Sequence, residues 1–141
     1  MLKKIACIFL IGLILGSGTL LADEADKEKA AIASAMQWLK LVDQSKYADS
    51  WQQASDYFKQ AVTEEDWIQT LQAVRKPLGE LISRDLNGAS YATSLPGAPD
   101  GQYFVIDFTS SFTHKESGIE KVTVKMDQDG TWKIAGYYLL N

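Results

Sequence analysis

Cysteine is almost absent from this chain of 141 residues. The one cysteine, Cys7, lies in an apolar stretch near the start. If that stretch is removed on export, the remaining chain has no cysteine at all. A domain without cysteine has no disulfide and no thiol nucleophile, so only its core holds it together.

Histidine is equally scarce, because His114 is the only one. It stands beside Lys115 and Glu116 in a polar turn, which is typical of a solvated loop residue. One histidine without cysteine excludes the usual zinc sites, and the turn from Asp127 to Gly130 has no acid at the twelfth position of a calcium loop. The sequence has no glycine-rich phosphate loop and no hydrolase triad pattern. It therefore predicts no metal, no cofactor and no catalytic residues.

The first residues have the order of a secretory signal. Two lysines precede an apolar run from Ile5 to Ala22, and a charged stretch follows. This order predicts that residues 1–22 are a signal peptide cleaved after Ala22. The alternative is an uncleaved membrane anchor, because the apolar run is almost as long as a membrane-spanning helix, which needs about 20 apolar residues. Glycines in its second half favour cleavage, and Cys7 lies too early to become a lipidated first residue.

Removing 22 of 141 residues leaves 119, which is enough for a single domain at 23–141. Two of the 14 basic residues and none of the 18 acidic ones lie in the signal, so the domain has a net charge of 12 − 18 = −6. This balance argues against nucleic acid and against adhesion to an anionic membrane. We expect a periplasmic or secreted protein without a membrane anchor after cleavage.

The first half of the domain predicts three helices. Apolar residues recur at three and four positions over 30–42, which indicates an amphipathic helix. A second helix is expected over 47–61. Thr63 is the expected N-cap of the third helix, with three acids in its first turn, and Pro77 and Gly79 end it.

After Gly79 the apolar period changes from 3.6 to two, which predicts strands. The expected strands span 81–86, 90–95, 102–112, 119–126 and 131–140. Asn87-Gly88 separates the first two, either as a turn or as a bend within one strand. This order predicts an α+β fold, with three N-terminal helices on one face of a curved antiparallel sheet of about four strands.

Alternation of side chains assigns the faces of the strands. It places Asp107 on the outer face as a solvated carboxylate. In the last strand it places Trp132, Ile134, Tyr138 and Leu140 on the apolar face. Tyr137 and Leu139 then point outward, where they join Tyr103 and Val105. Such an outer face is apolar enough for a homodimer, which is one predicted partner.

A set of residues spread through the domain forms a recognisable pattern. Its members are Trp38-Leu39, Asp43, Tyr47, Ser50-Trp51, Trp67, Arg75, Pro77-Leu78-Gly79, Arg84, Leu95-Pro96-Gly97, Pro99 to Tyr103, Phe108, Ser111-Phe112, Glu120, Asp129 to Lys133 and Gly136-Tyr137. Together they resemble a bacterial domain of unknown function, family four-zero-one-nine. The resemblance implies a small exported bacterial protein and supplies no activity. The helix-then-strand order is also similar to the nuclear transport factor 2-like and cystatin-like folds, in which a bent sheet wraps helices around a pocket.

Arg84 is a polar residue at a predicted core-facing position. If Ile82 and Leu86 face the core, Arg84 does too, whereas Leu81 favours the opposite facing. A buried arginine needs a carboxylate or carbonyl partner. A structural ion pair is the favoured interpretation, and an anionic ligand at the mouth of a pocket is the alternative.

The aromatic residues allow two interpretations. Trp38, Trp51, Trp67 and Trp132 all lie on apolar faces, which favours a shared core. The alternative is an aromatic-lined cavity for a small apolar ligand. Its predicted ligand-binding residues are Arg84, Trp51, Tyr57, Tyr91 and Tyr138.

These observations lead to two functional hypotheses. The favoured one is a non-catalytic binding or interaction module of the cell envelope with an unknown protein partner. The alternative is a small-ligand-binding protein or enzyme that uses a cavity between helices and sheet. A cavity above about 300 Å³ with Arg84 pointing into it favours the alternative. A filled core with an exposed apolar sheet face favours the first.

Overall fold

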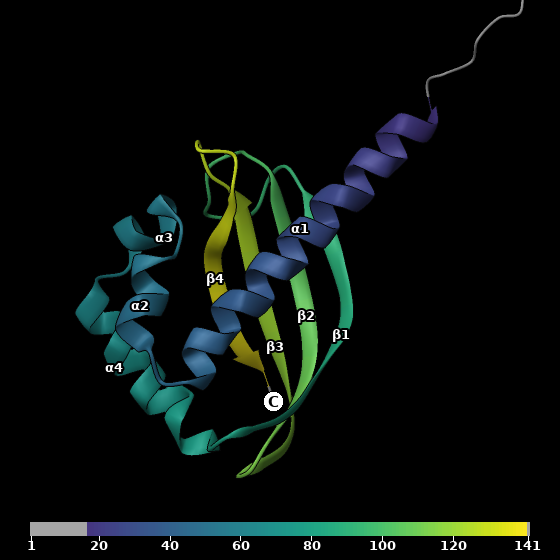
Figure 1. Cartoon of the computed structure of the whole chain (residues 1–141). Helices are drawn as coiled ribbons and strands as arrows, with labels where there is room; N and C mark the ends of the chain where they lie inside the picture. Colours follow the sequence, from purple (N-terminus) through teal and green to yellow (C-terminus); the bar gives the residue numbers. More distant parts are fainter. Residues whose placement is uncertain (1–16, 141) are drawn as a thin grey trace, which may run out of the picture.

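The computed structural model describes the backbone of residues 17–140 and the side chains of residues 23–140. Most of the predicted signal peptide, residues 1–16, lies outside the described residues. Within the described residues, four α-helices and one short 3-10 helix precede four strands (Figure 1). The α+β class and the four-stranded antiparallel sheet are therefore confirmed.

Helix α1 (Ser17–Asp43) is longer than the helix expected over 30–42. It continues through the charged residues 23–29, where Lys27 Nζ lies 3.6 Å from Asp23 Oδ2, one turn earlier. The residues that it buries most completely are Ala31, Ala35, Leu39 and Val42. Within the described part of the chain, no helix combines the length and the apolar character that crossing a membrane requires.

The predicted second helix is instead two helices, α2 (Tyr47–Gln52) and α3 (Asp56–Ala61). Ser55 interrupts them in an extended conformation, with φ −63° and ψ 157°. Its Oγ accepts the N–H of Phe58 at 3.1 Å and caps α3, while its own N–H donates to the Ile134 carbonyl at 2.9 Å. The expectation of three helices is therefore wrong. Apolar periodicity continues across this break in the backbone, so it hides the break.

Helix α4 (Glu64–Val74) begins as predicted, because Thr63 Oγ1 accepts the N–H of Asp66 at 3.2 Å. The 3-10 helix η1 (Lys76–Leu78) follows, and Gly79 turns the chain toward the sheet with φ +80°. A Cβ at Gly79 would lie 1.9 Å from Thr113 Oγ1. Both the positive φ and this close approach require glycine.

The strands β1 (Leu81–Ala92), β2 (Tyr103–Phe112), β3 (Lys115–Met126) and β4 (Trp132–Leu140) pair antiparallel in the order β1-β2-β3-β4. Asn87-Gly88 is not a turn. Leu86 pairs with Phe108 and Gly88 with Asp107, so Asn87 is an extra residue inside one long strand. The bend interpretation is therefore confirmed.

A second irregularity lies in β4 at Ala135. Val124 of β3 pairs with Ile134, and Thr123 pairs with Gly136, so Ala135 has no partner of its own. Because successive side chains of a strand point to opposite faces, one extra residue reverses the facing of every residue after it.

This bulge overturns the facing predicted for the end of the last strand. Trp132 packs in the core as predicted, but beyond the bulge it is Tyr137 that packs against the core. Tyr138 is 62% exposed and Leu140 is 45% exposed. The assignment of Tyr138 and Leu140 to the apolar face is therefore wrong, because strict alternation allows for no extra residue.

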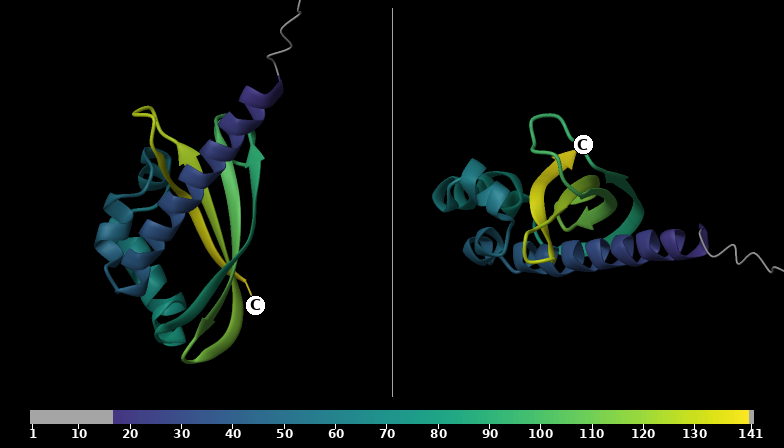
Figure 2. Two further views of the ribbon diagram at one scale, coloured as in Figure 1. Left: turned by 45° about the vertical axis from the view of Figure 1, so that its right-hand side comes forward. Right: turned by 90° about the horizontal axis from the view of Figure 1, so that it is seen from above.

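Helix α1 crosses one face of the curved sheet, and α2, α3 and α4 stand beside β4 (Figures 1 and 2). Side chains fill the space between α1 and the sheet. The most deeply buried of them on the two central strands are Phe104, Ile106, Phe108, Val122 and Val124. The core between α1 and the sheet is therefore filled.

The predicted dimerisation face has different members from those expected. Tyr103 is fully buried, and its hydroxyl donates to the Pro99 carbonyl at 2.5 Å in the preceding loop. Tyr137 faces inward. The large apolar residues that are exposed near the end of β4 are Ile119, Tyr138 and Leu140. A homodimer through the outer face stays a prediction, but Tyr103 and Tyr137 are not part of the exposed surface of that face.

Candidate functional site

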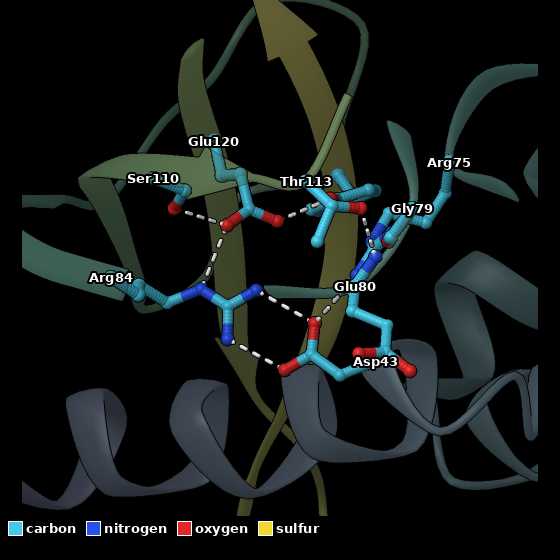
Figure 3. Close-up of polar contacts among 9 residues, drawn as sticks. Asp43, Arg75, Gly79, Glu80, Arg84, Ser110, Thr113 and Glu120 are labelled. Carbon is cyan, nitrogen blue, oxygen red and sulfur yellow. Dashed lines mark hydrogen bonds and ion pairs between the residues drawn. The ribbon is translucent and has the colours of Figure 1, made fainter. Parts of the chain in front are cut away.

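Four charged side chains from distant parts of the sequence meet at one end of the sheet (Figure 3). Asp43 ends α1, Arg75 follows α4, Arg84 lies on β1 and Glu120 lies on β3. We call these four residues the ion network. Their side chains are between 0% and 15% exposed, and two arginines balance two carboxylates.

Arg84 is the centre of the ion network. Its Nη1 and Nη2 donate to the two carboxylate oxygens of Asp43 at 2.8 and 2.9 Å, and its Nε donates to Glu120 Oε1 at 2.7 Å. The planar guanidinium thus makes a bidentate contact on one edge and a single bond on the other. The favoured prediction for Arg84, a structural ion pair at a core-facing position, is confirmed.

Glu120 is fully buried, and both of its oxygens accept hydrogen bonds. Besides Arg84 Nε, Oε1 accepts the hydroxyl of Ser110 at 2.5 Å. Oε2 accepts the hydroxyl of Tyr137. A carboxyl group that accepts from three donors is held in one orientation, so this geometry suits a structural role better than contact with a substrate.

Arg75 connects the ion network to the end of α4. Its Nη1 donates to the Gly79 carbonyl at 2.5 Å, and its Nη2 donates to Asp43 Oδ1 at 3.3 Å. Its guanidinium carbon lies 4.4 Å from the centroid of the Phe112 ring, a cation–π geometry. Arg75 therefore ties the turn before β1 to both α1 and β2.

The environment of the ion network shifts two pKa values in a clear direction. Burial by itself lowers the pKa of Arg84, but the hydrogen bonds and charges of Asp43 and Glu120 outweigh it, so the pKa is raised above its usual value. Burial raises the pKa of Tyr137, and the negative charge of Glu120 raises it further. Tyr137 therefore remains a neutral hydrogen-bond donor at all ordinary pH values.

A groove of about 490 Å³ lies between β4 and the helices α3 and α4. We call it the β4 groove. Its lining consists of Tyr57, Phe58, Ala61, Val62, Trp67, Thr70, Leu71, Val74, Ala135, Gly136, Tyr137, Tyr138 and Leu139. None of these residues carries a charge. The β4 groove therefore suits an uncharged, largely apolar ligand.

The two features meet at Tyr137. Tyr137 lines the β4 groove, and its ring centroid lies 5.5 Å from that of Trp38 and 6.4 Å from that of Trp67. Its hydroxyl points away from the groove to Glu120. The ion network thus fixes the floor of the groove.

The five predicted ligand-binding residues do not form one site. Tyr57 and Tyr138 line the β4 groove, and Arg84 belongs to the ion network. Trp51 donates its indole N–H to the Val62 carbonyl at 2.7 Å and holds α2 against the end of α3. Tyr91 is 46% exposed and packs 5.3 Å from the ring of Phe104, beside the start of α1.

The shared core predicted for the tryptophans is confirmed for three of the four. Trp38, Trp67 and Trp132 are 4% to 7% exposed. Trp38 and Trp67 donate their indole N–H groups to the carbonyl and the hydroxyl of Ser50, at 2.8 and 2.9 Å. Trp51 is half-buried and packs against the core from outside.

Two further sequence predictions concern single polar residues. Asp107 lies on the outer face, as predicted, where its Oδ1 is 3.7 Å from Lys121 Nζ. His114 is exposed, as predicted, with Nδ1 3.3 Å from the Pro77 carbonyl. Among the described residues, no group of three or more His, Cys, Asp or Glu side chains has the geometry of a metal site.

Sequence reasoning named neither partner of Arg84. Glu120 carried a usable signal, because it occupies the same alternate position as Val122 and Val124, and an acid on an apolar strand face needs a buried cation. Asp43 carries no such signal, since it directly follows the helix expected over 30–42. The role of Tyr137 was hidden by the bulge at Ala135.

Comparison with known families adds one result. A family model with the description "Protein of unknown function (DUF4019)" matches residues 34–137, which is more than half of the chain. The chain belongs to this family. The resemblance noted from the sequence is thereby confirmed, and the matched range contains all four residues of the ion network and Tyr137. No curated protein and no solved structure matches the chain, so the likeness to the nuclear transport factor 2-like and cystatin-like folds stays a prediction.

Proposed function

We propose that this member of the DUF4019 family is an exported, non-catalytic binding module of the bacterial envelope, and that the β4 groove is its binding site. One observation carries the proposal. The groove of about 490 Å³ has an uncharged lining and opens beside an edge strand. Its size lies within the usual range of ligand sites, about 300 to 1,000 Å³.

The distribution of charge supports binding rather than catalysis. An active site needs an acid, base or nucleophile that can reach a substrate. Here two of the buried ionisable groups, Arg84 and Glu120, bond to each other and to Asp43, Ser110 and Tyr137. Arg84 does not line the β4 groove. The geometry therefore favours a groove that recognises shape and apolar surface.

The proposal of export rests on the sequence of residues 1–22. The basic start, the apolar run and the small residue at position 22 fit a signal peptide that directs the domain to the periplasm. N-terminal sequencing of the protein from its own host tests this part. We expect Asp23 to be the first residue, and a chain that still begins with Met1 would show that the segment is retained.

Native mass spectrometry of protein purified from the host envelope tests the binding site. We expect a bound molecule that is lost in the Val74→Lys variant. Val74 lines the groove and is 46% exposed, so a lysine there places a charge in the groove without disturbing the core. Met36→Lys is the matched control, because Met36 is 39% exposed on α1, outside the groove.

Two results would oppose the proposed function. If no bound molecule is found and no purified candidate binds in a way that depends on Val74, the groove is not a binding site. If turnover of a substrate is detected and persists in Val74→Lys, the chemistry lies elsewhere on the protein. Retention of the ligand by Met36→Lys and its loss from Val74→Lys would support the proposal.

A further inference from the structure

We propose that the occupant of the β4 groove is an extended segment of another polypeptide, which adds to the sheet as a fifth strand beside β4. This inference rests on the proposed function, because it names the ligand class of the same groove. It comes from the backbone of β4 rather than from its side chains.

The β4 groove runs along the edge of the sheet. Five consecutive residues, 135–139, line it. Successive side chains of a strand point to opposite faces, so a groove lined by five in a row lies against the edge of the strand and not against one face. At that edge about half of the backbone N–H and C=O groups point away from β3.

The backbone groups along this edge are available. From Ile134 to Leu139, the one backbone hydrogen bond to a described residue outside β3 is that of the Ile134 carbonyl, which accepts the N–H of Ser55 at 2.9 Å. An unpaired edge is a ready template for another strand. In strand addition, main-chain hydrogen bonds supply the affinity and side-chain pockets supply the specificity.

The chain itself makes one hydrogen bond of such a pairing, at Ser55, and then turns away from β4. Ser55 is extended, with φ −63° and ψ 157°, and it bonds to β4 as a neighbouring strand would. The next residue, Asp56, starts α3 and leads the chain away. An added segment would continue along β4 from the position where Ser55 stops, so the contact between Ser55 and Ile134 marks one end of the site.

The surroundings favour a single extended segment over a second folded copy. Helices α3 and α4 stand beyond β4, on the side away from β3 (Figures 1 and 2). A second copy that paired its own β4 here would bring its own α3 and α4 into the same space. One extended chain needs only the width of a strand, about 4.8 Å.

The lining indicates the chemistry of the segment. One wall carries Phe58, Trp67 and Leu71, and the other is β4, with no charge on either. We therefore expect about five uncharged residues, with apolar side chains at alternate positions that face the wall formed by the helices.

The other free edge of the sheet is less suited to strand addition. Strand β1 is irregular at two places, between Leu81 and Ser83 and between Leu86 and Gly88, whereas β4 has one bulge, at Ala135, where the stretch that lines the groove begins. Bulges of this kind protect an edge from pairing. The pocket beside Tyr91 of β1 has a volume of only about 110 Å³, and its lining includes the charged residues Glu24, Lys27 and Glu28.

The test uses the purified protein and decapeptides selected from a random displayed library, each then synthesised as a free peptide. Every selected peptide is made in two further forms, N-methylated at alternate residues in one frame or in the other. Because only alternate N–H groups of an added strand face its neighbour, one frame should weaken binding by at least about tenfold, and the other should leave it nearly unchanged. Val74→Lys should weaken binding by a similar factor, and Met36→Lys should not.

The possible results separate this inference from the proposed function. Equal effects of the two N-methyl frames would overturn strand addition and leave a groove that binds side chains. A small molecule that is held in native mass spectra and lost in Val74→Lys, with no peptide binding, would have the same meaning. A homodimer that dissociates in Val74→Lys would replace the peptide by a second copy. If the protein shows no interaction that depends on Val74, both proposals are overturned.

Discussion

Tyr137 on β4, which lines the β4 groove, donates a hydrogen bond from its hydroxyl to the carboxylate of Glu120 on β3. The contact exists because Ala135 is an extra residue that turns Tyr137 toward the core. Through Glu120, Tyr137 is linked to Arg84 and from there to Asp43 at the end of α1. The same polar contacts therefore hold the end of α1 against the sheet and fix Tyr137 beside the β4 groove.

Replacing Arg84 should be strongly destabilising. Arg84→Met would leave Asp43 and Glu120 with one cation, Arg75, for two buried carboxylates. Breaking a buried ion pair from one side typically costs about 3–5 kcal/mol. We expect a loss of that size in the free energy of unfolding, measured by urea denaturation. Arg84→Lys should restore only part of it, because lysine cannot make the bidentate contact.

Lys121→Met is the control for this prediction. Lys121 pairs with Asp107 at 3.7 Å on the outer face, where both side chains are about two-fifths exposed, at 38% and 41%. Exposed pairs contribute about 0–1 kcal/mol. If Arg84→Met and Lys121→Met cost the same, the ion network does not stabilise the fold in the way described.

The neighbouring tyrosines of β4 should respond differently to loss of their hydroxyls. Tyr137→Phe leaves one oxygen of the buried Glu120 without its donor, which should cost about 1–3 kcal/mol of unfolding free energy. Tyr138 is 62% exposed, so Tyr138→Phe should change it by less than about 0.5 kcal/mol. The two variants compared by thermal and urea unfolding decide whether the bulge at Ala135 is present in solution.

The raised pKa of Tyr137 predicts a loss of stability at alkaline pH. Below about pH 10, the usual pKa of tyrosine, the phenol keeps its proton in both the folded and the unfolded chain, and its contribution is complete. Above about pH 10 the unfolded chain releases the proton and the folded chain does not. The unfolded state is thereby favoured by about 1.4 kcal/mol at pH 11.

The measurement is urea unfolding at pH 9 and at pH 11, on the parent protein and on Tyr137→Phe. The stability difference between them should shrink by about 1.4 kcal/mol across this interval, because only the parent has this phenol. A constant difference between parent and Tyr137→Phe would contradict the burial and pairing of this hydroxyl.

Ser50 should be far more sensitive than other helical serines. Its hydroxyl accepts the indole N–H of Trp67 at 2.9 Å and donates to the Tyr47 carbonyl at 2.6 Å. Ser50→Ala leaves a buried indole donor unsatisfied, so we expect a loss of about 1–3 kcal/mol in unfolding free energy. Ser34→Ala on α1 is the matched control, because it has the same helix propensity change at a half-buried position. Its effect should be close to zero or slightly stabilising.

Much of the fold could be predicted from the sequence, because local signals specify it. The cap at Thr63 and the acids that follow it are read directly from three or four adjacent residues. The change of apolar period after Gly79 separates helices from strands. Where the prediction failed, the cause was an interaction between distant residues. Ser55 breaks the second helix by bonding to Ile134, which is 79 positions later and invisible to a local pattern.

The candidate site was predicted less well, for a related reason. Arg84 faces the core as expected, but strict alternation does not explain it, because Ile82 and Leu86, which were expected on the same face, are 65% and 48% exposed. A bulge between Leu81 and Ser83 interrupts the alternation. Tyr57 and Tyr138 do line the β4 groove, but Tyr138 does so from the exposed side of β4. No local signal marks Ala135 as a bulge, and without it the facing of Tyr137 is reversed.

The sequence by itself determined the class of the fold and the kind of chemistry available. Apolar periodicity set helices before strands, and the scarcity of cysteine and histidine set the limits of its reactive side chains. Only the tertiary structure decided which residues meet. The partners of Arg84 come from the end of α1 and from β3, and the β4 groove forms between α3–α4 and an edge strand. Such contacts depend on strand register and on how the helices pack, and one extra residue in a strand is enough to change them.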